Sequence, residues 1–170
     1  MLSISKKPCS ICDTIGGHVK RIPDGETGDR TNWIFFQRKM LANHPAMEID
    51  SNVPKFQFKQ WDGKVVREVD LLKIKDGINL DQLVFPIGYS EHAIESFKNF
   101  ERLQSTGKIP SDVKFQVSLP TPFAAGYNYI SPNGRSEFLK IYEKSFVIDV
   151  NKILDAIPHK SLAILWDVCQ

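Results

Sequence analysis

The amino-acid sequence predicts an α/β fold that contains a parallel sheet. Two β-prone runs, at 113–119 and 161–167, are separated by a long amphipathic helical pattern in this chain of 170 residues. Strands that alternate with helices favour a parallel sheet with right-handed crossover connections. The second run is nearly all apolar, which is typical of a strand covered by protein on both faces.

The N-terminal part of the chain adds two helices and a short strand to this pattern. Residues 8–16 have the apolar spacing of a short helix, and residues 18–22 have that of a brief strand. Residues 23–30 contain two glycines and one proline, so we expect a loop there. Thr31 can cap the next helix, which Pro45 ends.

A β-hairpin is expected near residues 55–69, inserted between the larger elements. Phe56 and Phe58 have the period of two that is typical of a strand, and a second β-prone run follows Asp62 and Gly63. An Asp-Gly pair between two such runs is a strong signal for a tight hairpin turn.

The remaining segments predict two further helices. One begins at Ser90 and ends before Gly107, and the other extends from Ser136 to Ile157 with its apolar residues on one continuous face. Residues 123–134 are rich in glycine, asparagine and proline, so we expect a loop between the strand at 113–119 and the long helix.

Composition excludes several classes of function. The chain is 42% hydrophobic and 25% charged, and its net charge is +2. Such balance argues against nucleic-acid binding and against membrane binding through a basic surface. No apolar stretch approaches the roughly 18 residues of a membrane span, and the N-terminus lacks the apolar core of a signal peptide. We therefore expect a cytoplasmic protein that binds neither nucleic acid nor a membrane.

The three cysteines predict neither a disulfide framework nor a metal site. Cys9, Cys12 and Cys169 form an odd and sparse set, as expected in a reducing compartment. Cys9 and Cys12 form a C-x-x-C pair, but a structural zinc site needs a second pair of ligands. We therefore expect no metal or other cofactor bound by this chain.

Candidate site residues follow the predicted strands. In parallel α/β folds, ligands bind at the carboxyl ends of the strands. Three segments occupy such positions, at 23–30, 118–122 and 166–170. We expect all three segments to lie on one rim and to meet around a common pocket.

The first segment combines acids with an arginine. Asp24 or Glu26 could act as a general base or a metal ligand, and Arg30 could bind a carboxylate or a phosphate. The spacing leaves an alternative open: a surface turn with solvated charges, or a loop in which Arg30 pairs with Asp24 or Glu26.

The other two segments offer hydroxyl groups, an acid and an aromatic ring. Ser118 and Thr121 could bind a substrate by hydrogen bonds, and Gln116 shares a strand face with Ser118. The alternative is that the prolines in this segment simply end the strand. Trp166 and Asp167 could supply a pocket wall and a carboxylate, or Asp167 could cap a following helix.

These segments carry a resemblance to a known superfamily. Lys20–Arg30 with Trp33, Phe115–Pro122 and Leu165–Cys169 resemble a group of microbial and fungal proteins in the superfamily of cobalamin-independent methionine synthase and uroporphyrinogen decarboxylase. The resemblance covers roughly residues 10–170. It implies a parallel (β/α) barrel of TIM type. Because a complete barrel takes about 250 residues, the barrel would be incomplete: residues 1–170 would be a single partial domain, about the first half, without the first strand and the C-terminal half.

The resemblance also implies an enzyme that acts on a small polar or anionic substrate by alkyl transfer or decarboxylation. Its zinc ligands would lie beyond Gln170, so zinc is implied only for a complete barrel. The implied acid–base or anchoring groups are Asp24, Glu26 and Asp167. The implied substrate-binding groups are Arg21, Arg30, Trp33, Gln116, Ser118, Thr121 and Trp166.

A second hypothesis is a truncated, catalytically inactive fragment or pseudoenzyme. A partial barrel exposes the edges of its sheet and the apolar face of its last strand. Such a chain would need a partner or self-association for stability, so we expect a homo-oligomer in that case.

Overall fold

The chain forms two compact units, which are described in turn. The structure is a computed structural model that describes residues 18–25, 28–32 and 34–168. The sheet unit comprises residues 1–33, 88–120 and 147–170, and the hairpin unit comprises residues 34–87 and 121–146. The long helix α5 (Arg135–Ala156) begins in the hairpin unit and ends in the sheet unit.

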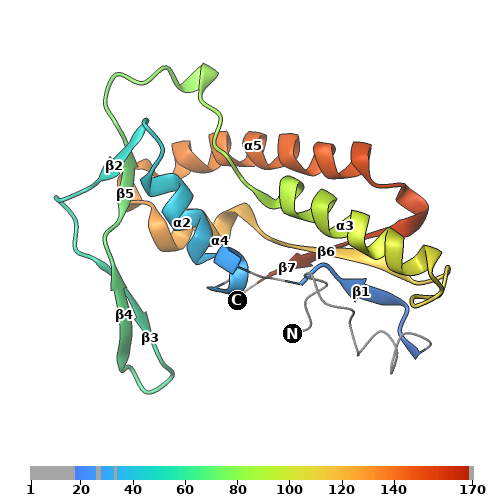
Figure 1. The fold of residues 1–170 in the computed structure, drawn as a ribbon. Coiled ribbons are helices and arrows are strands. Elements are labelled where there is room, and N and C mark those ends of the chain that lie inside the picture. The colour runs from blue at the N-terminus through green and yellow to red at the C-terminus, as the bar shows by residue number, and fades with distance from the viewer. Residues whose placement is uncertain (1–17, 26–27, 33, 169–170) are drawn as a thin grey trace. The chain divides into compact units, whose positions relative to one another are not determined.

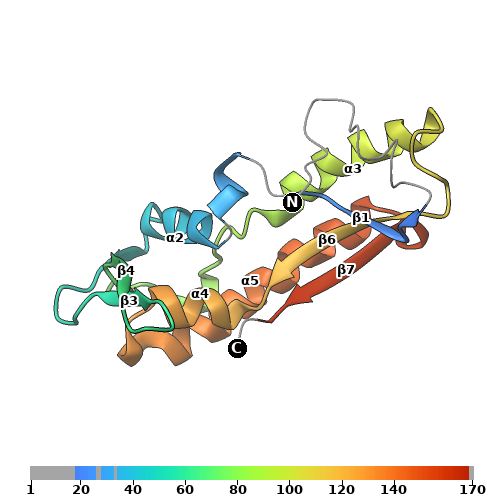
Figure 2. The same ribbon diagram turned by 90° about the horizontal axis from the view of Figure 1, so that it is seen from below.

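The sheet unit is built on a three-stranded parallel sheet. Its strands lie in the order β1 (Arg21–Pro23), β6 (Lys114–Pro120) and β7 (Leu162–Asp167), with β6 in the middle (Figure 2). Helix α3 (Tyr89–Ser105) and the second half of α5 lie on the same side of this sheet (Figure 1). The apolar spacing of these helices provides the face that packs on the strands.

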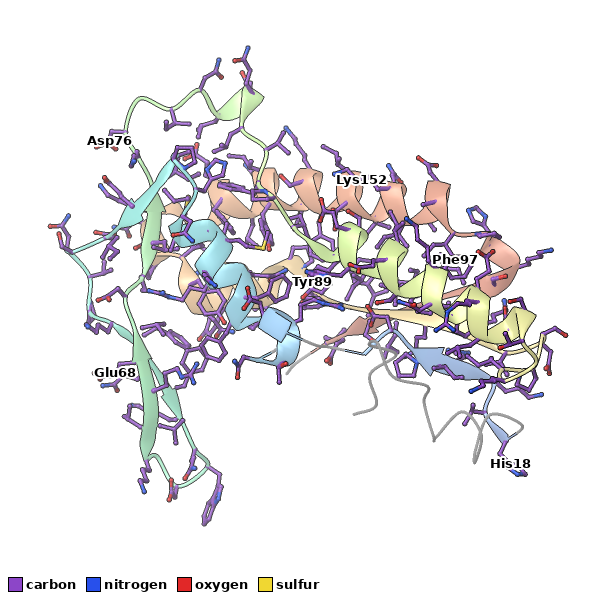
Figure 3. The ribbon with its side chains drawn as sticks, in the orientation of Figure 1. His18, Glu68, Asp76, Tyr89, Phe97 and Lys152 are labelled. Carbon is purple, nitrogen blue, oxygen red and sulfur yellow. The ribbon has the colours of Figure 1, made fainter. Side chains whose placement is uncertain are left out.

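Alternation along β6 separates a buried face from a polar one. The residues of β6 that face the helices are almost fully buried: Phe115, Val117 and Leu119. Phe97 and Phe100 of α3 pack on Phe115, with ring centroids 5.6 and 5.4 Å away, and Figure 3 labels Phe97 on its helix. Gln116 and Ser118 are half-buried on the opposite face, because successive strand residues point to opposite sides.

A buried carboxylate joins the two helices of the sheet unit. Asp149 of α5 accepts hydrogen bonds from the backbone N–H groups of Tyr89 and Ser90, at 3.1 and 3.0 Å, and from the Ser90 hydroxyl at 2.6 Å. Gly88 at the N-cap offers no side chain for this role. Asp149 therefore supplies the acceptor that the first turn of α3 needs.

The hairpin unit contains short elements. Its helices are α2 (Phe35–Ala42), α4 (Pro122–Tyr129) and the first half of α5, and its strands are β2 (Met47–Ile49), β3 (Phe56–Lys59), β4 (Val65–Val69) and β5 (Leu72–Ile74). β2 pairs antiparallel with β5, and β3 pairs antiparallel with β4. Single 3-10 turns complete the two units, at Gly28–Asn32, Leu80–Gln82, Pro132–Gly134 and His159–Ser161.

Aromatic side chains hold the β3–β4 hairpin against the helices of its unit. The Phe35 ring of α2 lies 5.3 Å from Phe58 of β3 and 5.9 Å from Tyr129 of α4. The Arg67 guanidinium of β4 lies 4.1 Å from the centre of the Phe35 ring, which is a cation–π contact. The hairpin is therefore anchored by its apolar face.

The expected incomplete barrel of TIM type is wrong. The described residues contain four α-helices and seven strands, but these strands form three small sheets and only one sheet is parallel. A barrel needs a closed ring of strands, whereas β1 and β7 each have a single neighbour among the strands that the structure describes. The chain between β1 and β6 forms two antiparallel pairs instead of further parallel strands.

Several individual elements lie where the sequence predicts them. β6 and β7 lie within one residue of the predicted strands at 113–119 and 161–167, β1 shares only Arg21 and Ile22 with the strand predicted at 18–22, and a hairpin lies within 55–69. The loop expected at 123–134 is wrong in part, because α4 occupies Pro122–Tyr129. The helix expected at 8–16 lies outside the described residues.

No helix in the described part of the chain is long and apolar enough to cross a membrane.

Candidate functional site

The three parallel strands all end on the same side of the sheet. We call this side the carboxyl edge, to distinguish it from the lateral edges formed by β1 and β7. Asp24 directly follows β1, and its N–H donates to the Gln116 carbonyl at 2.9 Å. Asp167 ends β7 in register with Pro120 of β6. Pro23 is in register with Gln116, so Asp24 lies about 10 Å short of the end of β6, at about 3.3 Å per residue. The three predicted segments thus lie at the carboxyl edge, but β1 ends about 10 Å before β6 and β7 do.

Asp24 and Arg30 form a buried ion pair beside this edge. Arg30 Nη1 donates to Asp24 Oδ2 at 2.9 Å, and Nη2 donates to the Gly25 carbonyl at 3.0 Å. The two residues are only 4% and 3% exposed. The structure therefore has the pairing that the spacing left open, and Arg30 is held by the protein's own groups.

Burial also affects the acid–base properties of this pair. Burial raises the pKa of the Asp24 carboxyl above its usual value of 3.8, and the neighbouring Arg30 charge opposes that rise. Arg30 Nε is buried and has no hydrogen-bond partner among the described residues. Asp24 is thus fixed in place by its partner.

Gln116, Ser118 and Asp167 lie on the sheet face opposite the helices. Gln116 Nε2 is 3.4 Å from Ser118 Oγ, which is a long hydrogen bond. Asp167 is exposed, and its register with Pro120 places it on the same face. Trp166 is in register with Leu119, so it lies on the helix-covered face instead. The structure thus brings three of the polar candidates to one face and places the expected aromatic wall on the other.

The remaining candidates are distributed elsewhere. Thr121 immediately follows Pro120 at the end of β6, and its side chain makes no cap for α4. Arg21 starts β1, at the opposite end from Asp24. There it lines an open hollow of about 470 Å³ with Lys20 and Lys114. Glu26, Trp33, Cys9, Cys12 and Cys169 lie outside the described residues.

The hairpin unit contains a polar pocket that the sequence analysis missed. Its volume is about 390 Å³. Its polar lining residues are Asp50, Asn52, Lys73, Ser131, Asn133 and Glu137. They come from three distant segments, which meet because β2 pairs with β5 and because the Ser131 N–H donates to the Leu72 carbonyl at 2.9 Å. The only local signal in the sequence is the Asp-Ser-Asn run at 50–52, which is typical of a turn.

Asp50 is the most constrained acid of this polar pocket. Its N–H donates to the Leu71 carbonyl at 2.9 Å, and its Oδ1 accepts from the Asn52 N–H at 3.1 Å. The Ser131 hydroxyl and the Asn52 amide lower the pKa of the Asp50 carboxyl below 3.8. The Ser131 hydroxyl is itself buried without a hydrogen-bond partner of good geometry among the described residues.

Across residues 18–25, 28–32 and 34–168, no three His, Cys, Asp or Glu side chains are grouped so that they could hold a metal ion. The side chains at the carboxyl end of the sheet offer hydrogen bonding by Gln116 and Ser118 and proton transfer or charge pairing by Asp167.

Comparison of the chain with protein-family models, with curated proteins and with solved structures finds no match in any of the three. The superfamily resemblance stays a prediction.

Proposed function

We propose that the carboxyl edge of the β1–β6–β7 sheet binds a small polar molecule. The observation that carries this proposal is the placement of Gln116, Ser118 and Asp167 on one face of adjacent parallel strands, with Asp167 at the end of β7 and Ser118 and Gln116 two and four residues before the end of β6. Ligands of parallel α/β proteins bind at that end of the sheet. Half-buried polar side chains without strong partners are available for such a ligand.

A neutral or cationic ligand fits this edge better than an anion. The Arg30 guanidinium is engaged by Asp24 and Gly25, and Arg21 lies at the other end of its strand. Asp167 is the exposed carboxylate on the polar face, so it would anchor a donor group or exchange a proton with the substrate. Asp24 would serve as a positioning residue through its contact with the Gln116 backbone. Alkyl transfer and decarboxylation remain predictions from the resemblance.

Three two-carbon probes of different charge test the proposal. Ethylene glycol, ethanolamine and glycolate are titrated into ¹⁵N-labelled protein while amide chemical shifts are recorded. We expect ethylene glycol and ethanolamine to shift the amides of Gln116, Ser118 and Asp167, and glycolate to shift them less.

Variants connect the shifts to the named side chains. Asp167→Asn and Ser118→Ala should reduce the shifts, whereas Asp155→Asn, an exposed acid on α5, should leave them unchanged. Shifts confined to other parts of the chain, or shifts that persist in both site variants, would overturn the proposal.

Self-association is the second candidate. β7 is an edge strand, and Leu165 and Val168 near its end are 43% and 62% exposed. Exposed apolar residues on an unpaired strand favour pairing with another chain. The test is the dependence of molar mass on protein concentration.

A further inference from the structure

The polar pocket of the hairpin unit shares no residue with the binding site proposed above, which consists of Gln116, Ser118 and Asp167. It is a second place where polar side chains converge. Its volume of about 390 Å³ falls within the range of small-molecule pockets. Every residue that lines it belongs to the hairpin unit.

The walls of the polar pocket carry an excess of negative charge. Asp50 and Glu137 contribute two carboxylates. Lys73 is the one cation among its lining residues, and its Nζ is already paired with Glu48 Oε1 at 3.1 Å. Glu137 makes no ion pair with any described residue. A ligand that brings positive charge would therefore complete the electrostatics of the pocket.

The polar pocket also contains an unused hydrogen-bonding group. Ser131 is only 1% exposed, and its hydroxyl, although close enough to lower the pKa of the Asp50 carboxyl, has no hydrogen-bond partner of good geometry among the described residues. A buried hydroxyl without a partner carries a desolvation cost that a ligand can relieve. Because a hydroxyl accepts as well as donates, an N–H donor of a ligand suits Ser131.

Backbone contacts fix the acid that would meet such a ligand. The Asp50 side chain is only one tenth exposed, and the turn at Asn52 holds its Oδ1. The Asp50 backbone is tied to Leu71, next to the β2–β5 pair. A fixed carboxylate loses little conformational entropy when a ligand binds.

We propose that this pocket binds a small molecule through a primary ammonium group, with Asp50 and Glu137 as counter-ions and the Ser131 hydroxyl as an acceptor. The ammonium group supplies a positive charge for the two carboxylates and an N–H donor for the Ser131 hydroxyl.

Probes that separate charge from hydrogen bonding test this assignment. n-Butylamine, n-butanol and tetramethylammonium are titrated into the full chain, and binding is measured by calorimetry and by ¹⁵N amide shifts. We expect n-butylamine, protonated at neutral pH, to bind at the amides around Asp50, Ser131 and Glu137. Butanol lacks the charge and tetramethylammonium lacks the N–H donors, so both should bind more weakly.

Two variants and a control locate the binding. Glu137 is exposed in the first turn of α5, so Glu137→Gln should fold and weaken butylammonium binding about tenfold, as expected for one charge-assisted hydrogen bond. Asp50→Asn keeps an acceptor for the Asn52 amide and should weaken binding at least as much. Glu143→Gln, another exposed acid of α5, should have no effect.

Three results would overturn the proposal. The first is the absence of saturable binding of n-butylamine in the millimolar range. The second is butanol binding as tight as that of n-butylamine, which would show that charge is not recognised. The third is Ca²⁺ shifting the same amides at lower concentration than n-butylamine, which would assign the pocket to a metal ion.

Discussion

Three buried aspartates have different structural roles in this protein, and each role is identified by the groups that the carboxylate contacts. Asp24 pairs with Arg30, Asp50 lines the polar pocket, and Asp149 caps α3. Each would be an uncompensated charge without its partners. Sequence spacing suggested the first role as one of two alternatives, because Asp24 and Arg30 are close along the chain. The other two roles depend on contacts between distant segments, so no local pattern could reveal them.

Removing the carboxylate that caps α3 should destabilise the protein. Asp149→Ala leaves the N–H groups of Tyr89 and Ser90 without their acceptor, so the free energy of unfolding should fall by about 1–3 kcal/mol. Urea denaturation measures the change, and Asp149→Asn should restore part of it. Asp155→Ala, at an exposed position of the same helix, should stay within about 0.5 kcal/mol of the wild type. Equal stabilities for the Asp149 and Asp155 variants would contradict the capping role.

Asp50 should make stability depend on pH in the acidic range. Its pKa is lower in the folded state than the usual 3.8, so the folded protein binds fewer protons than the unfolded chain between these two values. The stabilisation from Asp50 is therefore present above pH 3.8 and is lost as the pH falls through the folded pKa.

The comparison of wild type with Asp50→Asn measures that contribution. The difference in free energy of unfolding should be larger at about pH 6 than at about pH 3. A difference that stays constant across this range would show that the ionisation of Asp50 is not linked to folding.

At the scale of elements, regular periodicity decided which segments could be predicted. β6 and the long helix extend over enough residues to show a period of two and of 3.6, and β7 is marked by its nearly all-apolar run. β2 and β5 have three residues each, too few for a pattern. α4 contains proline, glycine and asparagine, yet it forms because its proline occupies the first turn and because Arg135 donates to the carbonyls of Gly126, Tyr127 and Ile130 at its end.

The turn of the β3–β4 hairpin should be sensitive to loss of its glycine. Gly63 has φ +83°, and a Cβ there would meet no atom within 4 Å, so the cost of Gly63→Ala is purely conformational. We expect a loss of about 1–2 kcal/mol in hairpin stability, measured by hydrogen exchange of the Gln60 and Gly63 amides. Gly134→Ala has equally open space without a positive φ and should leave that exchange unchanged. Unaltered exchange in the Gly63 variant would mean that the turn adopts another conformation.

At the scale of the molecule, the expected barrel rested on resemblance and not on any pattern in the chain itself. The chain organises instead into two compact units, each with its own buried aromatic cluster. The sheet unit has helices on one face in its described part and a free strand at each edge (Figure 2). The polar face and the β7 edge are therefore the surfaces on which the proposed binding and self-association depend.

Self-association through the β7 edge should depend on the apolar residue of its uncovered face. Leu165 is in register with Ser118, so Leu165→Lys places a charge on that face beside the edge. We expect the wild type to form dimers or larger species as concentration rises in light scattering, and Leu165→Lys to shift the equilibrium toward the single chain. Val147→Lys changes an exposed apolar residue on α5 and serves as the control. A single-chain mass for the wild type at every concentration would exclude this association.

The cap on α3 has a consequence for the order of events during synthesis. Asp149 follows Tyr89 by 60 positions, so a ribosome has made the whole of α3 long before it makes the carboxylate that satisfies its first turn. Until then the start of that helix must bond to water or fray. Docking of α5 then supplies a contact of high sequence separation, of the kind that slows folding.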